Sequence, residues 1–135
     1  MKRIKGMAGF LGEAAEAPSF RPISEDEYWR YIESQGHELM PQWVRDEIKR
    51  VGDSLFDYFS VSLVQRYVKD GFKHRYYNMW FLPRGYRLGL VTTRLTLTDE
   101  DWFLVNYVDE AGVQAYRCDG LDGLKELLHH IAKNN

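Results

Sequence analysis

Residues 102–118 read WFLVNYVDEAGVQAYRC, and this stretch decides which fold the chain adopts. Aromatic and β-branched residues dominate 102–108 and 113–118, a composition typical of strands. Between them, at 109–112, stand Asp, Glu, Ala and Gly, and Gly112 can take a positive φ at little steric cost. The stretch therefore predicts a β-hairpin.

Further strands are expected before this hairpin. From Gly71 onward, β-branched and aromatic residues dominate and turn residues recur at short intervals. We expect one strand over 76–82, a longer strand over 86–98, and turns at 83–85 and 99–101. Because consecutive strands usually pair with their neighbours, the segment predicts an antiparallel meander of about four strands.

Two helices are expected before the sheet. Ser24 and Glu27 have the spacing of a capping box, in which the serine hydroxyl accepts a hydrogen bond from the amide three residues on. Gly36 is placed to end that helix. Pro41 suits the first turn of a second helix, which Gly52 would end.

Two more segments show helical spacing. Residues 54–70 predict a helix, although Phe59 and Val61 alternate with serines, so that a strand remains the alternative. Asp119 can cap a final helix over 120–133, whose leucines form an apolar stripe toward the sheet. The predicted fold class is α+β: N-terminal helices, an antiparallel meander of about four strands, and a C-terminal helix packed on the sheet.

The chain has 135 residues and a mass of 15.9 kDa, the size of one globular domain. We expect residues 21–135 to form this domain and residues 1–20 to be a flexible N-terminal arm, or alternatively a docking peptide that uses Phe10 and Leu11. A single cysteine, Cys118, excludes an intrachain disulfide and favours a reducing, cytoplasmic compartment. Charged residues interrupt every hydrophobic run, so no membrane span is expected.

The formal net charge of −2 conceals three blocks of different sign. Residues 1–65 sum to −3, residues 66–94 to +6 and residues 95–135 to −5. The central block, which we call the basic-aromatic block, also carries seven aromatic residues. Such a combination suits an anionic partner, because Arg and Lys neutralise negative charge while exposed rings stack on planar groups.

The candidate binding residues are those members of the basic-aromatic block that are expected at the surface. Their types match the enrichment of Arg, Tyr and Trp at protein interfaces. The alternative is that the aromatic residues form the core of the sheet and the charges its solvated face. The candidates are Arg75, Tyr77, Trp80, Arg84, Tyr86 and Arg87.

The remaining residues show no catalytic or metal-binding pattern. Cys118 precedes a predicted helix N-terminus, but the neighbouring Asp119 opposes thiolate formation and no histidine is placed as its base, so an inert thiol is the simpler interpretation. His129 and His130 are adjacent on the last helix and point about 100° apart, which prevents them from chelating one ion. Phosphate-binding loops and dinucleotide fingerprints are absent from the sequence. We therefore predict no catalytic residue, no metal and no cofactor.

Together these features favour a small non-enzymatic binding or regulatory protein that meets an acidic protein surface through the basic-aromatic block. A nucleic-acid-binding module that uses the same block is the first alternative. An unrecognised small enzyme is the second. Homo-oligomers remain open as well, because the basic block of one copy can meet the acidic blocks of another.

Overall fold

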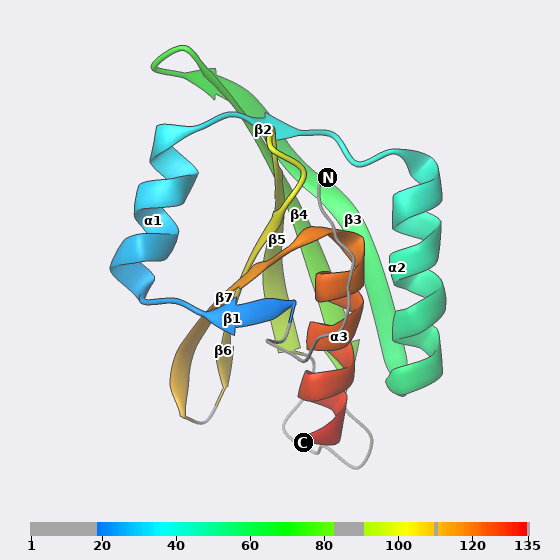
Figure 1. The fold of residues 1–135 in the computed structure, drawn as a ribbon. Coiled ribbons are helices and arrows are strands. Elements are labelled where there is room, and N and C mark those ends of the chain that lie inside the picture. The colour runs from blue at the N-terminus through cyan, green and yellow to red at the C-terminus, as the bar shows by residue number, and fades with distance from the viewer. Residues whose placement is uncertain (1–18, 83–90, 110, 135) are drawn as a thin grey trace, which may run out of the picture.

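The computed structural model describes residues 19–82, 91–109 and 111–134. Three helices and seven strands lie within this part of the chain (Figure 1). In chain order they are β1 Phe20–Pro22, α1 Glu25–Ser34, β2 His37–Glu38, α2 Gln42–Leu55, β3 Tyr58–Lys69, β4 Phe72–Leu82, β5 Val91–Thr98, β6 Phe103–Asp109, β7 Gly112–Cys118 and α3 Gly120–Lys133.

The described strands form one antiparallel sheet. Its order is β1-β7-β6-β5-β4-β3, and the short β2 pairs with β5. The predicted α+β class and antiparallel pairing are confirmed, but the sheet has seven strands rather than about four. Two of the additional strands, β1 and β2, contain three and two residues. Strands this short are invisible to an alternation pattern, which needs at least four residues.

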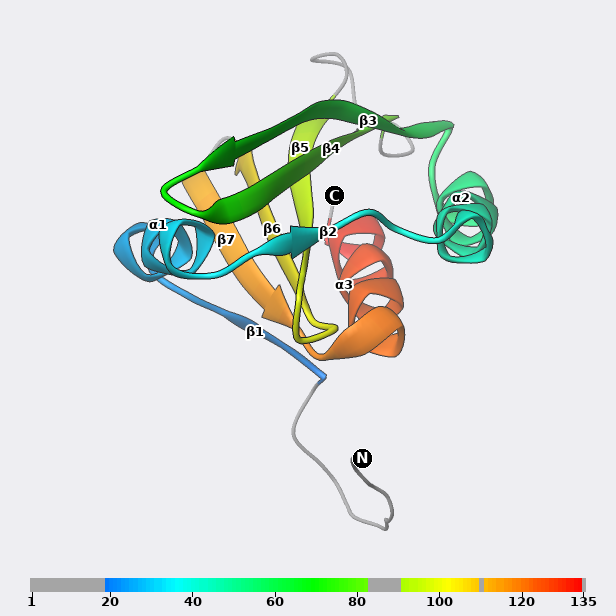
Figure 2. The same ribbon diagram turned by 90° about the horizontal axis from the view of Figure 1, so that it is seen from above.

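Helices cover both faces of the sheet. Figures 1 and 2 show α1 on one side of the strands and α2 with α3 on the other. The α2–α3 side holds the larger core, and the α1 side holds a smaller core around the fully buried Tyr28. Successive residues of a strand point to opposite faces, so Tyr77 of β4 enters the larger core while Tyr76 enters the smaller one.

The prediction of a helix over residues 54–70 is wrong. Helix α2 ends at Leu55, and β3 then pairs with β4 along its whole length. The alternation around Phe59 was the correct signal, since this ring is buried against α2 while its serine neighbour faces the other side. A shift of register between Leu63 and Gln65 interrupts the period of two, which is why helical spacing fitted the segment as well.

Gly52 does not end α2, contrary to the prediction. It lies within the helix and is buried where the helix crosses β3. A Cβ at this position would overlap the ring of Phe59. The missing side chain therefore allows the close approach of α2 and β3 instead of reversing the chain.

The residues predicted to begin helices or to form turns are only partly confirmed by the structure. The N–H of Glu27 donates to Ser24 Oγ at 3.0 Å, which confirms the serine N-cap, but the Glu27 carboxylate accepts a hydrogen bond from the Tyr31 hydroxyl and does not complete the capping box. Gly112 has a φ of 113° in the hairpin turn. Asp119 precedes α3 but makes no side-chain cap there, and its carboxylate lies 3.6 Å from Arg117 Nε.

The first described strand contacts the last helix. Phe20, which the predicted boundary places in the arm, begins β1 and pairs with β7. The neighbouring Ser19 donates its hydroxyl hydrogen to Glu126 Oε1 at 2.6 Å and accepts a hydrogen bond from the Asp119 N–H at 2.7 Å. Gly123 of α3 leaves room for the carbonyl oxygen of Ser19, because a Cβ at position 123 would overlap that oxygen. The chain thus joins β1 to α3 by direct contacts.

Some expectations concern residues outside the described ranges. They include the character of residues 1–18, the docking role of Phe10 and Leu11, and the turn at 83–85. Among the helices that the structure describes, none is long and apolar enough to cross a membrane.

Replacing Gly52 with alanine is expected to lower the free energy of unfolding by about 1–3 kcal/mol. The added methyl group overlaps the Phe59 ring, and this overpacking outweighs the roughly 1 kcal/mol that alanine gains over glycine inside a helix. Urea denaturation measures the change. In the double variant Gly52→Ala/Phe59→Leu the alanine should cost less, whereas a Gly52→Ala variant more stable than the parent would contradict the close packing.

Candidate functional site

The structure distributes the sequence-predicted binding residues over different environments. Tyr77 is buried in the α2–α3 core, where its hydroxyl oxygen accepts a hydrogen bond from Met40 N–H at 2.9 Å. Arg75 donates to the carbonyl oxygens of Tyr67 and His74 and thereby braces the β3–β4 hairpin. Trp80 is half-buried on the α1 side of the sheet. The remaining three candidates, Arg84, Tyr86 and Arg87, lie outside the described residues.

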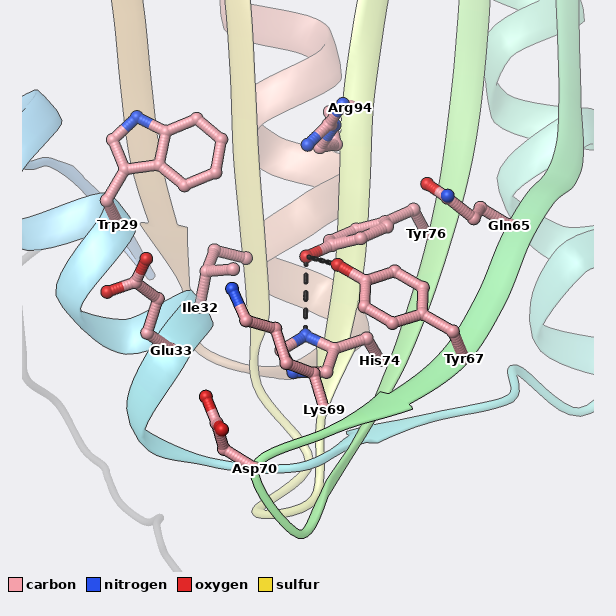
Figure 3. Close-up of a pocket in the computed structure, with 10 residues that line it drawn as sticks. All are labelled: Trp29, Ile32, Glu33, Gln65, Tyr67, Lys69, Asp70, His74, Tyr76 and Arg94. Atoms are coloured by element: carbon pink, nitrogen blue, oxygen red, sulfur yellow. Dashed lines mark hydrogen bonds between the residues drawn. The ribbon is translucent and has the colours of Figure 1, made fainter.

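A cavity of about 430 Å³ lies between α1 and strands β3 to β5 (Figure 3). We call it the α1 pocket. Aromatic and charged side chains dominate its walls, and they come from both ends of the basic-aromatic block and from α1. Its lining residues are Trp29, Ile32, Glu33, Gln65, Tyr67, Lys69, Asp70, His74, Tyr76 and Arg94.

Arg94 is a half-buried cation in this pocket. Its guanidinium carbon lies 4.7 Å from the centre of the Tyr76 ring and 5.9 Å from that of Trp29, both within cation–π range. Its charge also reaches Tyr28, where burial raises the pKa of the hydroxyl and Arg94 opposes that rise. Within the described ranges no carboxylate pairs with Arg94, and none of its N–H groups donates a hydrogen bond. These donors are therefore available to a ligand.

One wall of the pocket is a cluster of three rings. Tyr67 and His74 are stacked, with ring centres 4.9 Å apart and planes inclined by 6°. The Tyr76 hydroxyl lies 3.4 Å from both the Tyr67 hydroxyl and His74 Nδ1. Burial raises the pKa of Tyr76, and the hydrogen bond with Tyr67 adds to this rise. Tyr76 therefore stays protonated at neutral pH and can hydrogen-bond to a ligand but not act as a base.

Behind this wall, His37 fastens α1 to the sheet. Its Nδ1 accepts the N–H of Arg75 at 3.4 Å, so the proton resides on Nε2, which donates to the Ile32 carbonyl oxygen at 3.1 Å. The ring is edge-on to His74, with centres 4.8 Å apart. Burial, and then the neighbouring His74, lower the pKa of His37 to about 4. His37 is therefore neutral at physiological pH, as both hydrogen bonds require.

Further charges lie at the other end of the pocket. Figure 3 shows Arg94 at one end of the view and Asp70 at the other, with Glu33 and Lys69 extending from opposite walls. Among the described residues none of Glu33, Lys69 and Asp70 forms an ion pair. The lining thus holds two basic and two acidic side chains. Such a lining favours a ligand that carries charges of both signs over a ligand whose charges all have one sign.

Other candidate chemistry finds less support in the described part of the chain. Cys118 is fully buried, and burial together with Asp119 raises the pKa of its thiol, so it stays protonated. Among the described His, Cys, Asp and Glu residues, no group of three or more is placed to hold a metal ion. A second hollow, of about 580 Å³, lies beside Trp43, but its Glu47 and Lys125 pair with each other at 2.7 Å.

Comparison of the chain with protein-family models, curated proteins and solved structures finds no match.

Sequence reasoning named the block that contains Arg94 but did not single this residue out, and it missed the contribution of α1 altogether. Two signals were present. Arg94 is the only charged residue in the sequence VTTRLTLT of β5, a composition that is otherwise typical of a buried strand. Trp29 lies beside the buried Tyr28 on an otherwise polar side of α1 and is 38% exposed. Of the two, the charge in an otherwise buried strand is the informative signal, because charged residues are rarely buried unless they are paired.

Stability is expected to fall as the pH drops from about 6.5, the ordinary pKa of histidine, to about 4, the pKa of buried His37. In this window the unfolded chain binds a proton at His37, whereas the native protein keeps His37 neutral. The free energy of unfolding is therefore up to about 3 kcal/mol higher above pH 6.5 than at pH 4. Denaturation of the parent and of His37→Gln from pH 7.5 to 4 measures the effect, and the variant should show the weaker pH dependence.

The exposed His129 provides the control for this experiment. His129→Gln should retain the pH dependence of the parent protein. Equal pH dependence in the parent and in His37→Gln would contradict a neutral, hydrogen-bonded His37.

Proposed function

We propose that this chain is a non-enzymatic binding protein whose α1 pocket receives an acidic side chain of a partner protein. The observation that carries the proposal is Arg94, a half-buried cation held against the rings of Trp29 and Tyr76 with no carboxylate partner among the described residues. A guanidinium with free donors recognises a carboxylate through paired, charge-assisted hydrogen bonds. Aromatic rings beside an arginine are also the composition of interface hot spots.

The charges of the pocket favour a protein over a nucleic acid. A nucleic acid would bring a phosphate with every nucleotide, and these would meet Glu33 and Asp70 as well as Arg94 and Lys69. A protein segment can place one carboxylate at Arg94 and a basic side chain beside Glu33 or Asp70. The preferred partner is therefore a segment of mixed charge that contains an acidic residue.

Arg94→Gln is expected to weaken binding of such a segment by about 10- to 100-fold, because a hydrogen-bonded ion pair is worth about 1.5–3 kcal/mol. An array of short synthetic peptides, each with one Asp or Glu near a Lys or Arg, provides the probes. Matched copies carry Asn or Gln in place of the acidic residue. Fluorescence polarisation of the selected labelled peptides then gives their dissociation constants.

Arg66→Gln is the matched control, because it removes the same charge from an exposed position on β3. It should leave the affinity within about twofold, as expected of a solvated charge. The proposal fails if no acidic peptide binds better than its amide copy, or if Arg94→Gln binds as the parent does. Arg94-dependent, steeply salt-sensitive binding of a single-stranded oligonucleotide in place of peptides would support the nucleic-acid alternative.

A further inference from the structure

Arg94 belongs to a row of polar side chains that crosses the sheet. Ser62 of β3 pairs in register with Asn78 of β4, Asn78 with Arg94 of β5, and Arg94 with Asn106 of β6. Residues paired in this way point to the same face. The four side chains, which we call the polar row, therefore lie side by side on the face that carries α1, and Arg94 connects them with the α1 pocket.

The side chains of the polar row are half-buried, and they form no hydrogen bonds with other described residues. Within these ranges the side chains of Ser62, Asn78 and Asn106 form no hydrogen bond with another residue. The next row includes half-buried Trp80, which pairs in register with Ser60 of β3 and with exposed Thr92 of β5. Helix α1 thus covers one part of this face and leaves a polar strip beside it (Figure 2).

The spacing of the row matches an extended peptide. Asn78 and Asn106 lie on strands β4 and β6, two strand spacings apart, or about 9.6 Å. An extended chain advances about 3.3 Å per residue, so three residues span nearly the same distance. Each asparagine amide offers both a donor and an acceptor, which a peptide group can satisfy together. Arg94 lies between the two amides, at the place where the peptide would present a carboxylate.

We propose that the partner segment is an extended peptide that crosses the sheet along the polar row. Asn78 and Asn106 hydrogen-bond its main chain, Arg94 binds an acidic side chain between these two points, and the flanking residues enter the α1 pocket. This inference rests on the proposed function, because it takes the acidic protein partner as given. It adds that the peptide backbone is recognised as well as the carboxylate.

The double variant Asn78→Ala/Asn106→Ala tests the role of the row. With an acidic peptide selected on the array as the probe, its affinity should fall about tenfold or more, as expected for losing two neutral hydrogen bonds. Thr92→Ala is the matched control, since Thr92 is exposed on the same face one row away. This control should bind as the parent does, and thermal unfolding checks that both variants remain folded.

A modified peptide separates backbone recognition from other effects. Methylation of the two main-chain nitrogens that flank the acidic residue should weaken binding to the parent protein but change little for the double alanine variant. If the double variant does not fold, the single changes Asn78→Ser and Asn106→Ser replace it in the same comparison, and each should show a smaller response to methylation than the parent.

The outcomes distinguish this inference from the proposed function. Arg94-dependent binding that neither the asparagine changes nor methylation weakens would overturn the polar-row inference and leave the proposed function standing. Failure of every acidic peptide to bind would overturn both. A third outcome is that no peptide binds, but the protein self-associates or binds an oligonucleotide and loses this property on Arg94→Gln. That result would also overturn both proposals and assign this face to another occupant.

Discussion

The structure depends on strand β4, which must bury side chains on both of its faces at once. Tyr77 and Phe81 enter the core beneath α2 and α3, while Tyr76 enters the core beneath α1. Successive side chains of a strand point in opposite directions, so a slip of one residue would exchange the two sets. The register of β4 with its neighbours therefore fixes both cores, and through them the positions of all three described helices.

The two faces are covered unequally, and the candidate site follows from this difference. Two helices of 14 residues pack on one face, whereas the 10-residue α1 packs on the other. Beside α1 the sheet presents polar side chains in place of core residues. Arg94 lies at this boundary, where the rings of Trp29 and Tyr76 shield it partly from water. Partial desolvation strengthens the attraction of such a cation for an anion while leaving its donors accessible.

Local signals predicted much of the fold, whereas the site depends on pairings that no local signal reveals. The N-cap at Ser24 and the turn at Gly112 could be predicted because each acts within a few residues. Gly52 was misread, since a glycine that ends a helix and one that admits the Phe59 ring look alike in a sequence. The basic-aromatic block pointed to the region of Arg94. Its contact with Trp29 joins distant segments and required the sheet register to be known.

The contact between β1 and α3 also bears on the order in which the chain is built during synthesis. Ser19 bonds to Glu126 across a sequence separation of 107 residues, and Phe20 pairs with Cys118. On the ribosome, β1 emerges long before β7 and α3, and it has no strand to pair with until they follow. Contacts this distant in sequence slow folding because a long loop must close first. We therefore expect the edge of the sheet that β1 occupies to be completed late, so that the pairing edge of β7 is exposed to other chains until β1 joins it.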